Sequence, residues 1–221
     1  MARNIERDRR EAERRKKQII EAGFRLFSKE GIENVTLQRV ANEADVGIAT
    51  LYKYFLTKER LVIAISRSIW GDAWQKVLER QGSAGFDKFT AYQSIRLYTD
   101  EIIRIYRENP EFLRFSGEYK TFVNKVEVDR EQLKEHLDVL EPIGILFHRM
   151  YEKAKIDHSI RTDIPEQQMF TTVIITMLSI AERYAQGIVW AASDREDYTQ
   201  ELIYLQEMIL AWCAGDGAKM C

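Results

Sequence analysis

Apolar side chains recur at the spacing of an α-helix through most of this 221-residue chain. In the first such stretch, Ile20, Phe24 and Phe27 follow one another at intervals of four and three residues, which places them on one face of a helix. Only three prolines and eleven glycines are present, so few residues would interrupt helices of this kind. No strand pattern competes with this periodicity. We therefore expect an all-α fold of about nine or ten helices.

The expected helices begin and end at residues that commonly cap or interrupt helices. Thr36 is a candidate N-cap, Gly47 is expected to take an unusual backbone angle in a turn, and Pro142 is expected to kink or split its helix. Residues 1–17 are a run of mixed charges, for which we expect a frayed arm that becomes helical toward its end. The predicted helices cover residues 9–29, 36–44, 48–55, 57–80, 86–107, 110–115, 118–127, 129–155, 165–191 and 195–213.

Charge is distributed unevenly along the chain. Residues 1–60 contain 14 Lys and Arg against 10 Asp and Glu, a net charge of +4, and the remainder carries −6. A positive segment suits an anionic polymer such as nucleic acid, although a merely solvated surface explains the same bias. We expect two domains: residues 1–57, a helix-turn-helix domain with a basic N-terminal arm, and residues 58–221, a larger helical domain for ligand binding and dimerisation.

The segment from Val35 to Phe55 has the pattern of two short helices joined by a tight turn. Small residues at Ala41 and Ala44 would let the two helices cross closely. The outer face of the second helix would then present Thr50, Lys53 and Tyr54. A helix of this size fits the major groove of DNA, which is about 12 Å wide.

This segment resembles the tetracycline-repressor-type (TetR) transcriptional regulators, over about Ile19 to Ala64. The most specific part is Thr50-Leu-Tyr-Lys-Tyr-Phe55, followed by Lys58-Glu59 and Leu61, where family members commonly read T-L-Y-x-H-F-x-x-K-E-x-L. Tyr54 departs from the frequent histidine, and Lys53 adds a positive charge at a variable position. The resemblance implies a helix-turn-helix regulator that binds double-stranded DNA at a near-palindromic operator.

The resemblance also implies a role for each matched residue. Phosphate contacts would come from Thr36, Tyr52, Tyr54 and Lys58, and hydroxyls and ammonium groups do bind phosphate oxygens. Contacts to bases or sugar-phosphate would come from Gln38, Ile48, Ala49 and Thr50. Taken singly, Tyr52 and Phe55 could equally be core aromatics of a helical hairpin, and Thr36 only a cap. The predicted DNA-binding residues are Thr36, Gln38, Ile48, Ala49, Thr50, Tyr52, Lys53, Tyr54 and Lys58.

The last two long helices are apolar over more than one face, which predicts contact with a second copy of the chain. We expect a homodimer through a four-helix bundle with an isologous interface, and a monomer that buries these stripes internally is the alternative. The predicted interface residues are Met169, Val173, Met177, Ile180, Tyr184, Leu202, Leu205, Ile209 and Trp212.

Large aromatic and flexible side chains concentrate in the middle of the chain. Such residues could line a pocket for a small apolar effector, as the family resemblance implies, although each could equally be core. The candidate pocket residues are Trp70, Trp74, Phe112, Phe115, Tyr119, Phe147, Met150 and Met177. An effector would release the protein, acting as a repressor, from its operator.

Other classes of protein are less well supported. Catalytic motifs such as G-x-S-x-G and H-E-x-x-H are missing, and His136, His148 and His158 are dispersed, so we expect no enzyme, no cofactor and no metal. The apolar stretch 170–192 contains Glu182 and Arg183, so a membrane span is not expected. With Cys213 and Cys221 as its only cysteines, the protein fits the cytoplasm. A helical protein-interaction module without DNA binding remains the alternative function.

Overall fold

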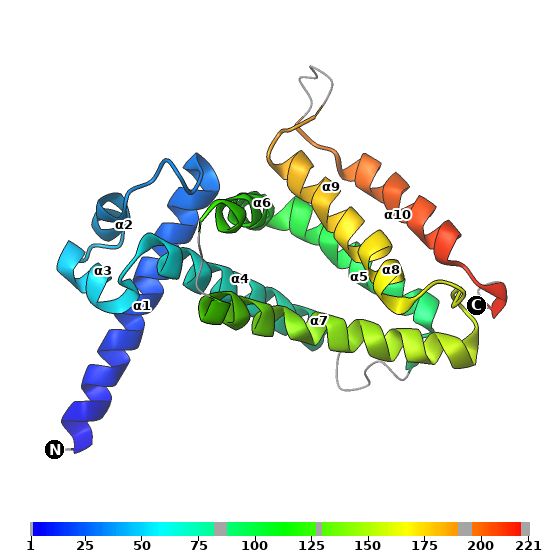
Figure 1. Cartoon of the computed structure of the whole chain (residues 1–221), viewed down its shortest axis with the longest axis horizontal. Helices are drawn as coiled ribbons and strands as arrows, with labels where there is room; N and C mark the ends of the chain where they lie inside the picture. The colour runs from blue at the N-terminus through cyan, green and yellow to red at the C-terminus, as the bar shows by residue number, and fades with distance from the viewer. Residues whose placement is uncertain (1, 82–87, 127–129, 190–195, 218–221) are drawn as a thin grey trace. The chain divides into compact units, whose positions relative to one another are not determined.

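The computed structural model describes residues 2–81, 88–126, 130–189 and 196–217. Within these ranges the fold is all-α, as expected, and the one β-type contact is an isolated antiparallel bridge between Ile160 and Ala214 (Figure 1). The elements are α1 (Ala2–Glu30), α2 (Leu37–Glu43), α3 (Ile48–Phe55), α4 (Lys58–Gln81), α5 (Ala91–Glu108), α6 (Pro110–Lys125), α7 (Arg130–Asp157), α8 (Glu166–Phe170), the π-helix η2 (Thr171–Ile175), α9 (Thr176–Ala185) and α10 (Thr199–Cys213).

The chain divides into two compact units. Unit 1 consists of Met1–Gly71 and Glu118–Val139, and unit 2 consists of Asp72–Gly117 and Leu140–Cys221. Unit 1 therefore extends beyond the boundary expected at residue 57. The division of labour between a DNA-binding part and a regulatory part stays a prediction.

Close packing of α1 against α4 explains why unit 1 includes the first part of α4. Leu61 and Ile65 of α4 are fully buried. A Cβ atom on Gly23 of α1 would come within 2.7 Å of the Ile65 Cδ1 atom and within 3.7 Å of Leu61 Cδ2. Any side chain at this position would therefore force the buried Ile65 side chain to shift. The residues that follow Thr57 thus complete the core of the first unit.

Helix α1 begins at Ala2, so the expectation of a frayed arm before residue 9 is wrong. Its charges are spaced so that opposite signs meet three or four residues apart. Arg10 pairs with Glu6 at 2.7 Å, and Arg15 pairs with Glu11 at 3.0 Å. Hydrogen bonds from Arg14 and Arg15 lower the pKa of Glu11 to about 2. Pairs at this spacing favour the helical conformation.

The turn between α2 and α3 uses a different residue from the one expected. Gly47 has an ordinary extended backbone, with φ −66° and ψ 143°, and it precedes α3 as its N-cap. The left-handed conformation falls instead on Asp45, with φ 51°. Aspartate tolerates this region because its short polar side chain can form local hydrogen bonds. Thr36 caps α2 as predicted, because its hydroxyl accepts a hydrogen bond from the Arg39 amide at 3.3 Å.

Leu56, between α3 and α4, occupies a strained backbone conformation. Its φ is 57° and its ψ is −51°, and the Thr57 amide donates to the Phe55 carbonyl at 2.5 Å across it. This three-residue turn is costly for a branched side chain. The Leu56 side chain is 56% exposed, so little apolar burial compensates for the strain.

Replacement of Leu56 by glycine is therefore expected to raise the free energy of unfolding by about 0.5–1 kcal/mol, because relief of strain exceeds the added entropy of the unfolded chain. Urea denaturation followed by circular dichroism measures the change. Leu56→Ala is the control, since alanine keeps the penalty of a positive φ. Equal stability of the two variants would show that the turn is not strained.

In unit 2, α5 packs against α9 and α10 (Figure 1). A buried polar contact joins α5 to α10: the Gln206 side-chain amide donates to Thr99 Oγ1 at 2.8 Å and to Asp100 Oδ1 at 2.6 Å. The helix α5 begins later than the expected residue 86, at Ala91, because Thr90 and Gln93 form a capping box. Similarly, α10 begins at Thr199, after the expected residue 195, which lies outside the described residues.

The two short helices expected at 110–115 and 118–127 are one helix, α6. The helix continues through Gly117, where the lack of a side chain makes room for the side chain of Gln186. A Cβ atom there would lie 2.4 Å from the Gln186 side-chain nitrogen. Nearby, the Ser116 hydroxyl donates to the buried Glu182 carboxylate at 2.7 Å. Pro142 likewise does not split its helix, since α7 continues through it.

The helix expected at 165–191 is shorter and has a change of pitch. Its first turns form α8, residues 171–175 form the π-helix η2, and α9 ends at Ala185. At the end of η2, the backbone amide of Thr176, the first residue of α9, donates to the carbonyl of Thr171, five residues earlier. Gly187, with φ 71°, takes a left-handed conformation and ends the helical stretch.

Candidate nucleic-acid interface

The predicted DNA-binding residues lie on the surface of unit 1. None of the nine side chains is buried: Thr36, Gln38, Ala49, Tyr52 and Lys53 are exposed, and Ile48, Thr50, Tyr54 and Lys58 are half-buried. Leu51 and Phe55, on the opposite face of α3, are buried in the unit. The helix α3 therefore has an outward polar face that contains Thr50, Lys53 and Tyr54. A helix that enters a DNA groove needs such a face.

Tyr52 and Phe55 behave differently, although both were candidates for the core. The Tyr52 side chain is 47% exposed, whereas that of Phe55 is 7% exposed. An exposed phenol gains nothing from its position in the isolated chain, so the core interpretation of Tyr52 fails. Its hydroxyl is available to a phosphate oxygen.

Helix α2 is attached to α1 by ion pairs at the surface. The Arg39 guanidinium donates two hydrogen bonds to the Glu30 carboxylate, at 2.6 and 2.9 Å, and Arg25 pairs with Glu43 at 3.1 Å. The bonds from Arg39 hold the pKa of Glu30 below its ordinary value. Arg39 is therefore engaged within the protein and supports the position of α2.

Lys58 has a structural contact as well as a predicted DNA contact. Its ammonium donates to the Glu33 carbonyl at 3.2 Å and lies 5.9 Å from the centre of the Phe27 ring. Partial burial lowers the pKa of this ammonium. Lys58 thus joins the start of α4 to the loop before α2, at the edge of the candidate interface.

Lys16 is a residue that the sequence pattern did not single out. Its ammonium lies 5.9 Å from the centre of the Tyr54 ring, which brings the basic arm next to α3. The long separation between Lys16 and Tyr54 hides this contact in the sequence. The nearest signal was the positive net charge of the first 60 residues.

The candidate effector residues do not form one described site. Phe112, Phe115, Phe147, Met150 and Met177 are buried in unit 2, and Trp70 and Tyr119 are buried in unit 1. Trp74 belongs to α4, but its side chain lies outside the described residues.

A cavity of about 790 Å³ lies elsewhere in unit 2. Arg107, Arg114, Tyr184 and Tyr198 contribute to its wall, and the two tyrosine rings stack with their centres 4.7 Å apart. None of the eight candidate residues lines this cavity. The seven candidate side chains that the structure describes are core in the isolated chain, because aromatic content does not distinguish a packed core from a pocket.

Most of the predicted dimer residues are also core. Met169, Val173, Met177, Leu202 and Ile209 are 0–7% exposed in the single chain, so they are not available to a second copy. Ile180, Tyr184 and Leu205 are half-buried, and Trp212 is 37% exposed. Five of the nine predicted residues therefore pack within unit 2, and Trp212 is the one of the nine that is exposed.

Trp212 and two residues outside the predicted set form an exposed apolar stripe on α10. Tyr204, Met208 and Trp212 recur every four residues and are 56%, 68% and 37% exposed. Ile175 of η2 is 40% exposed. No described helix is both long and apolar enough to cross a membrane.

Comparisons with known proteins agree with this architecture. A sequence model of bacterial regulatory proteins of the tetR family matches residues 19–65. The transcriptional repressor KstR of Mycolicibacterium smegmatis is 33% identical over 101 residues, 45% of this chain and 48% of that protein. The chain thus matches about half the length of KstR. A transcriptional regulator of Staphylococcus aureus is 24% identical over 172 residues, 75% of this chain and 83% of that protein.

Solved structures share the fold at low sequence identity. The regulator FadR of Bacillus subtilis, solved with stearoyl-CoA, is 14% identical and has a TM-score of 0.67, covering 88% of this chain and 97% of that one. A TetR-family protein from Vibrio parahaemolyticus is 17% identical with a TM-score of 0.63, covering 90% and 98%. All of these similar proteins are regulators of transcription, and none is described as an enzyme.

Proposed function

Because the chain belongs to the tetR family of bacterial regulatory proteins, we propose that it binds an operator through α2 and α3 and regulates transcription as a repressor. The main support for the proposal is the exposed polar face of α3. Leu51 and Phe55, on the other side of the helix, are buried and fix its orientation. In this arrangement Tyr52, Lys53 and Tyr54 contact phosphates, and Ala49 and Thr50 approach the bases. The identity with KstR, a repressor, supports the sign of the regulation.

An electrophoretic mobility shift with the DNA upstream of the gene for this chain tests the proposal. We expect a specific complex whose affinity falls steeply between about 50 and 200 mM salt, because phosphate contacts release counterions. A scrambled duplex of equal length is the control. A protein-interaction module without DNA binding would give no complex with either duplex at any salt concentration.

We also propose that two copies associate through the exposed apolar stripe of α10. Tyr204, Met208 and Trp212 form one face, and a helix with this much exposed apolar surface is stabilised by a partner. Two-fold symmetry would place the same stripe on both sides of the interface and present two α3 helices to a near-palindromic operator.

Met208→Glu is expected to weaken this association at least tenfold, because it would bury a charge in an apolar contact. Sedimentation velocity at micromolar concentration should give about twice the 26.0 kDa chain mass for the unchanged protein and a shift toward the monomer for the variant. Ile156→Glu on α7 is the control, since Ile156 is 80% exposed and lies outside the stripe. Equal effects of the two substitutions would place the interface elsewhere.

We propose that a small, mainly apolar effector binds unit 2 and releases the operator. Unit 2 contains the cavity of about 790 Å³ whose wall includes the stacked rings of Tyr184 and Tyr198, and the fold is shared with FadR, which was solved with stearoyl-CoA. Release follows if the effector favours a conformation with lower operator affinity. The test is the operator complex itself: an effector should dissociate it at a concentration near its own Kd for the protein alone.

A further inference from the structure

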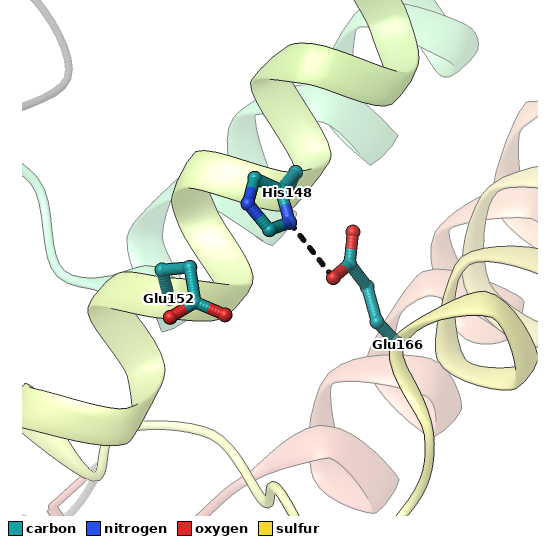
Figure 2. A group of neighbouring side chains, drawn as sticks. All are labelled: His148, Glu152 and Glu166. Atoms are coloured by element: carbon teal, nitrogen blue, oxygen red, sulfur yellow. Dashed lines mark hydrogen bonds and ion pairs between the residues drawn. The ribbon is translucent and has the colours of Figure 1, made fainter.

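Three metal-ligating side chains meet at the surface of unit 2, and none of them belongs to the candidate interfaces or lines the cavity. His148 and Glu152 are four residues apart on α7, so their side chains lie on one face of the helix, and Glu166 is in the first turn of α8. Figure 2 shows Glu166 facing His148 from this neighbouring segment. Ligand atoms of the three residues all lie within 4.8 Å of one another.

The distances between these ligand atoms are close to those found around a bound metal ion. His148 Nδ1 lies 2.9 Å from Glu166 Oε2. In a tetrahedral zinc site, bonds of about 2.0–2.2 Å place neighbouring ligand atoms about 3.3–3.6 Å apart. The Glu152 side chain is 48% exposed, and its ligand atom lies within 4.8 Å of those of the other two residues.

We propose that His148, Glu152 and Glu166 bind a divalent transition-metal ion, with Zn²⁺ as the best match and water as the fourth ligand. An imidazole with two carboxylates is a donor set that zinc accepts, whereas Mg²⁺ and Ca²⁺ prefer oxygen ligands alone. The sequence pointed away from a metal because its histidines are dispersed. The third ligand comes from a different helix, so no linear motif contains the set.

Lys155 is the competitor that a metal ion must displace. Its ammonium donates a hydrogen bond to Glu152 and lies 5.4 Å from the centre of the Tyr151 ring. The removal of this cation leaves the two carboxylates less neutralised. A variant without Lys155 should therefore bind the metal ion more tightly. If other residues formed the site, loss of Lys155 would not change the affinity in this way.

The ion would connect two elements that are separated along the chain. Glu152 precedes the end of α7 at Asp157, and Glu166 begins α8 after the intervening loop. The unfolded chain does not hold these ligands together, so binding stabilises the folded state. This site is independent of DNA binding, and its test can fail while the proposed function stands.

Isothermal titration calorimetry with Zn²⁺ on the chelator-treated full chain, prepared without a histidine tag, tests the proposal. Every protein carries Cys221→Ser, because a cysteine thiolate is itself a strong zinc ligand. We expect one Zn²⁺ per chain, at least tenfold weaker binding for His148→Ala and for Glu166→Gln, and tighter binding for Lys155→Gln. All these residues are at least one third exposed, and circular dichroism verifies that each variant is folded.

His158→Asn is the matched control. His158 is exposed near the end of α7 with φ 51°, a conformation that asparagine also adopts, and it lies outside the cluster. Its affinity for Zn²⁺ should match that of the parent protein within about twofold. The proposal would be overturned if the parent protein bound no Zn²⁺ at 1 mM, a concentration that corresponds to roughly the weakest specific affinities. It would also be overturned if His148→Ala bound Zn²⁺ as tightly as the parent.

Discussion

Phe27→Ala is expected to lower the free energy of unfolding by about 3–5 kcal/mol, the cost of a large cavity in a closed core. The Phe27 side chain is fully buried in unit 1, among the helices that carry the candidate DNA interface. Whole domains are stable by about 5–15 kcal/mol, so this single change should remove a large part of the stability of the unit. The Lys58 ammonium, 5.9 Å from the ring centre, would also lose its contact.

Urea denaturation followed by circular dichroism measures this effect. Lys29→Ala is the matched control, because Lys29 belongs to the same helix and is exposed. We expect its free energy of unfolding to stay within about 0.5 kcal/mol of the parent value. A loss below about 1 kcal/mol for Phe27→Ala would mean that the surrounding helices collapse into the space left by the ring.

Lys53→Glu is expected to reduce operator affinity about 100-fold without a loss of stability, because an anion replaces a cation where phosphates approach. Lys53 is exposed in the last turn of α3, and its side chain supports no buried contact. The salt dependence of binding should also become less steep, by about one unit in the slope of log K against log salt for the lost phosphate contact.

Lys29→Glu provides a charge-matched comparison for this second prediction. Lys29 is also an exposed lysine in the last turn of a helix, so the two variants change the net charge equally. Fluorescence anisotropy with a labelled operator should separate them by at least tenfold in Kd if α3 enters the groove. Equal losses would indicate that only the total charge of the protein matters, and the assignment of α3 would then be wrong.

Local rules predicted unit 1 well because its sequence signals are local. The cap at Thr36, the short α2 and α3, and the exposed face with Lys53 all depend on residues within a few positions of one another. The charge run of α1 was misjudged for a related reason. Opposite charges three and four residues apart stabilise a helix, whereas a count of charges alone suggests a frayed arm.

Predictions for unit 2 depended on distant partners that the sequence does not reveal. The helices predicted at 110–115 and 118–127 are continuous, and Gly117 between them leaves room for the distant side chain of Gln186. Met169 and Leu202 looked like interface residues because their helices are apolar on several sides, and periodicity cannot tell which apolar side faces a neighbour in the same chain. The sequence missed the cluster of His148 and Glu166 for the same reason, because one ligand lies on α7 and the other on α8.

The π-helix between α8 and α9 has a consequence for how this chain tolerates changes of length. A residue deleted from an ordinary α-helix turns everything beyond it by about 100° and takes the apolar side chains off the core. In η2 the extra residue is already accommodated, and the neighbours Val173 and Ile174 are both buried. A deletion within Thr171–Ile175 would restore a regular helix and leave Met177 and Ala181 facing inward. Alignments of related sequences should therefore place their single-residue gaps in this helix at η2.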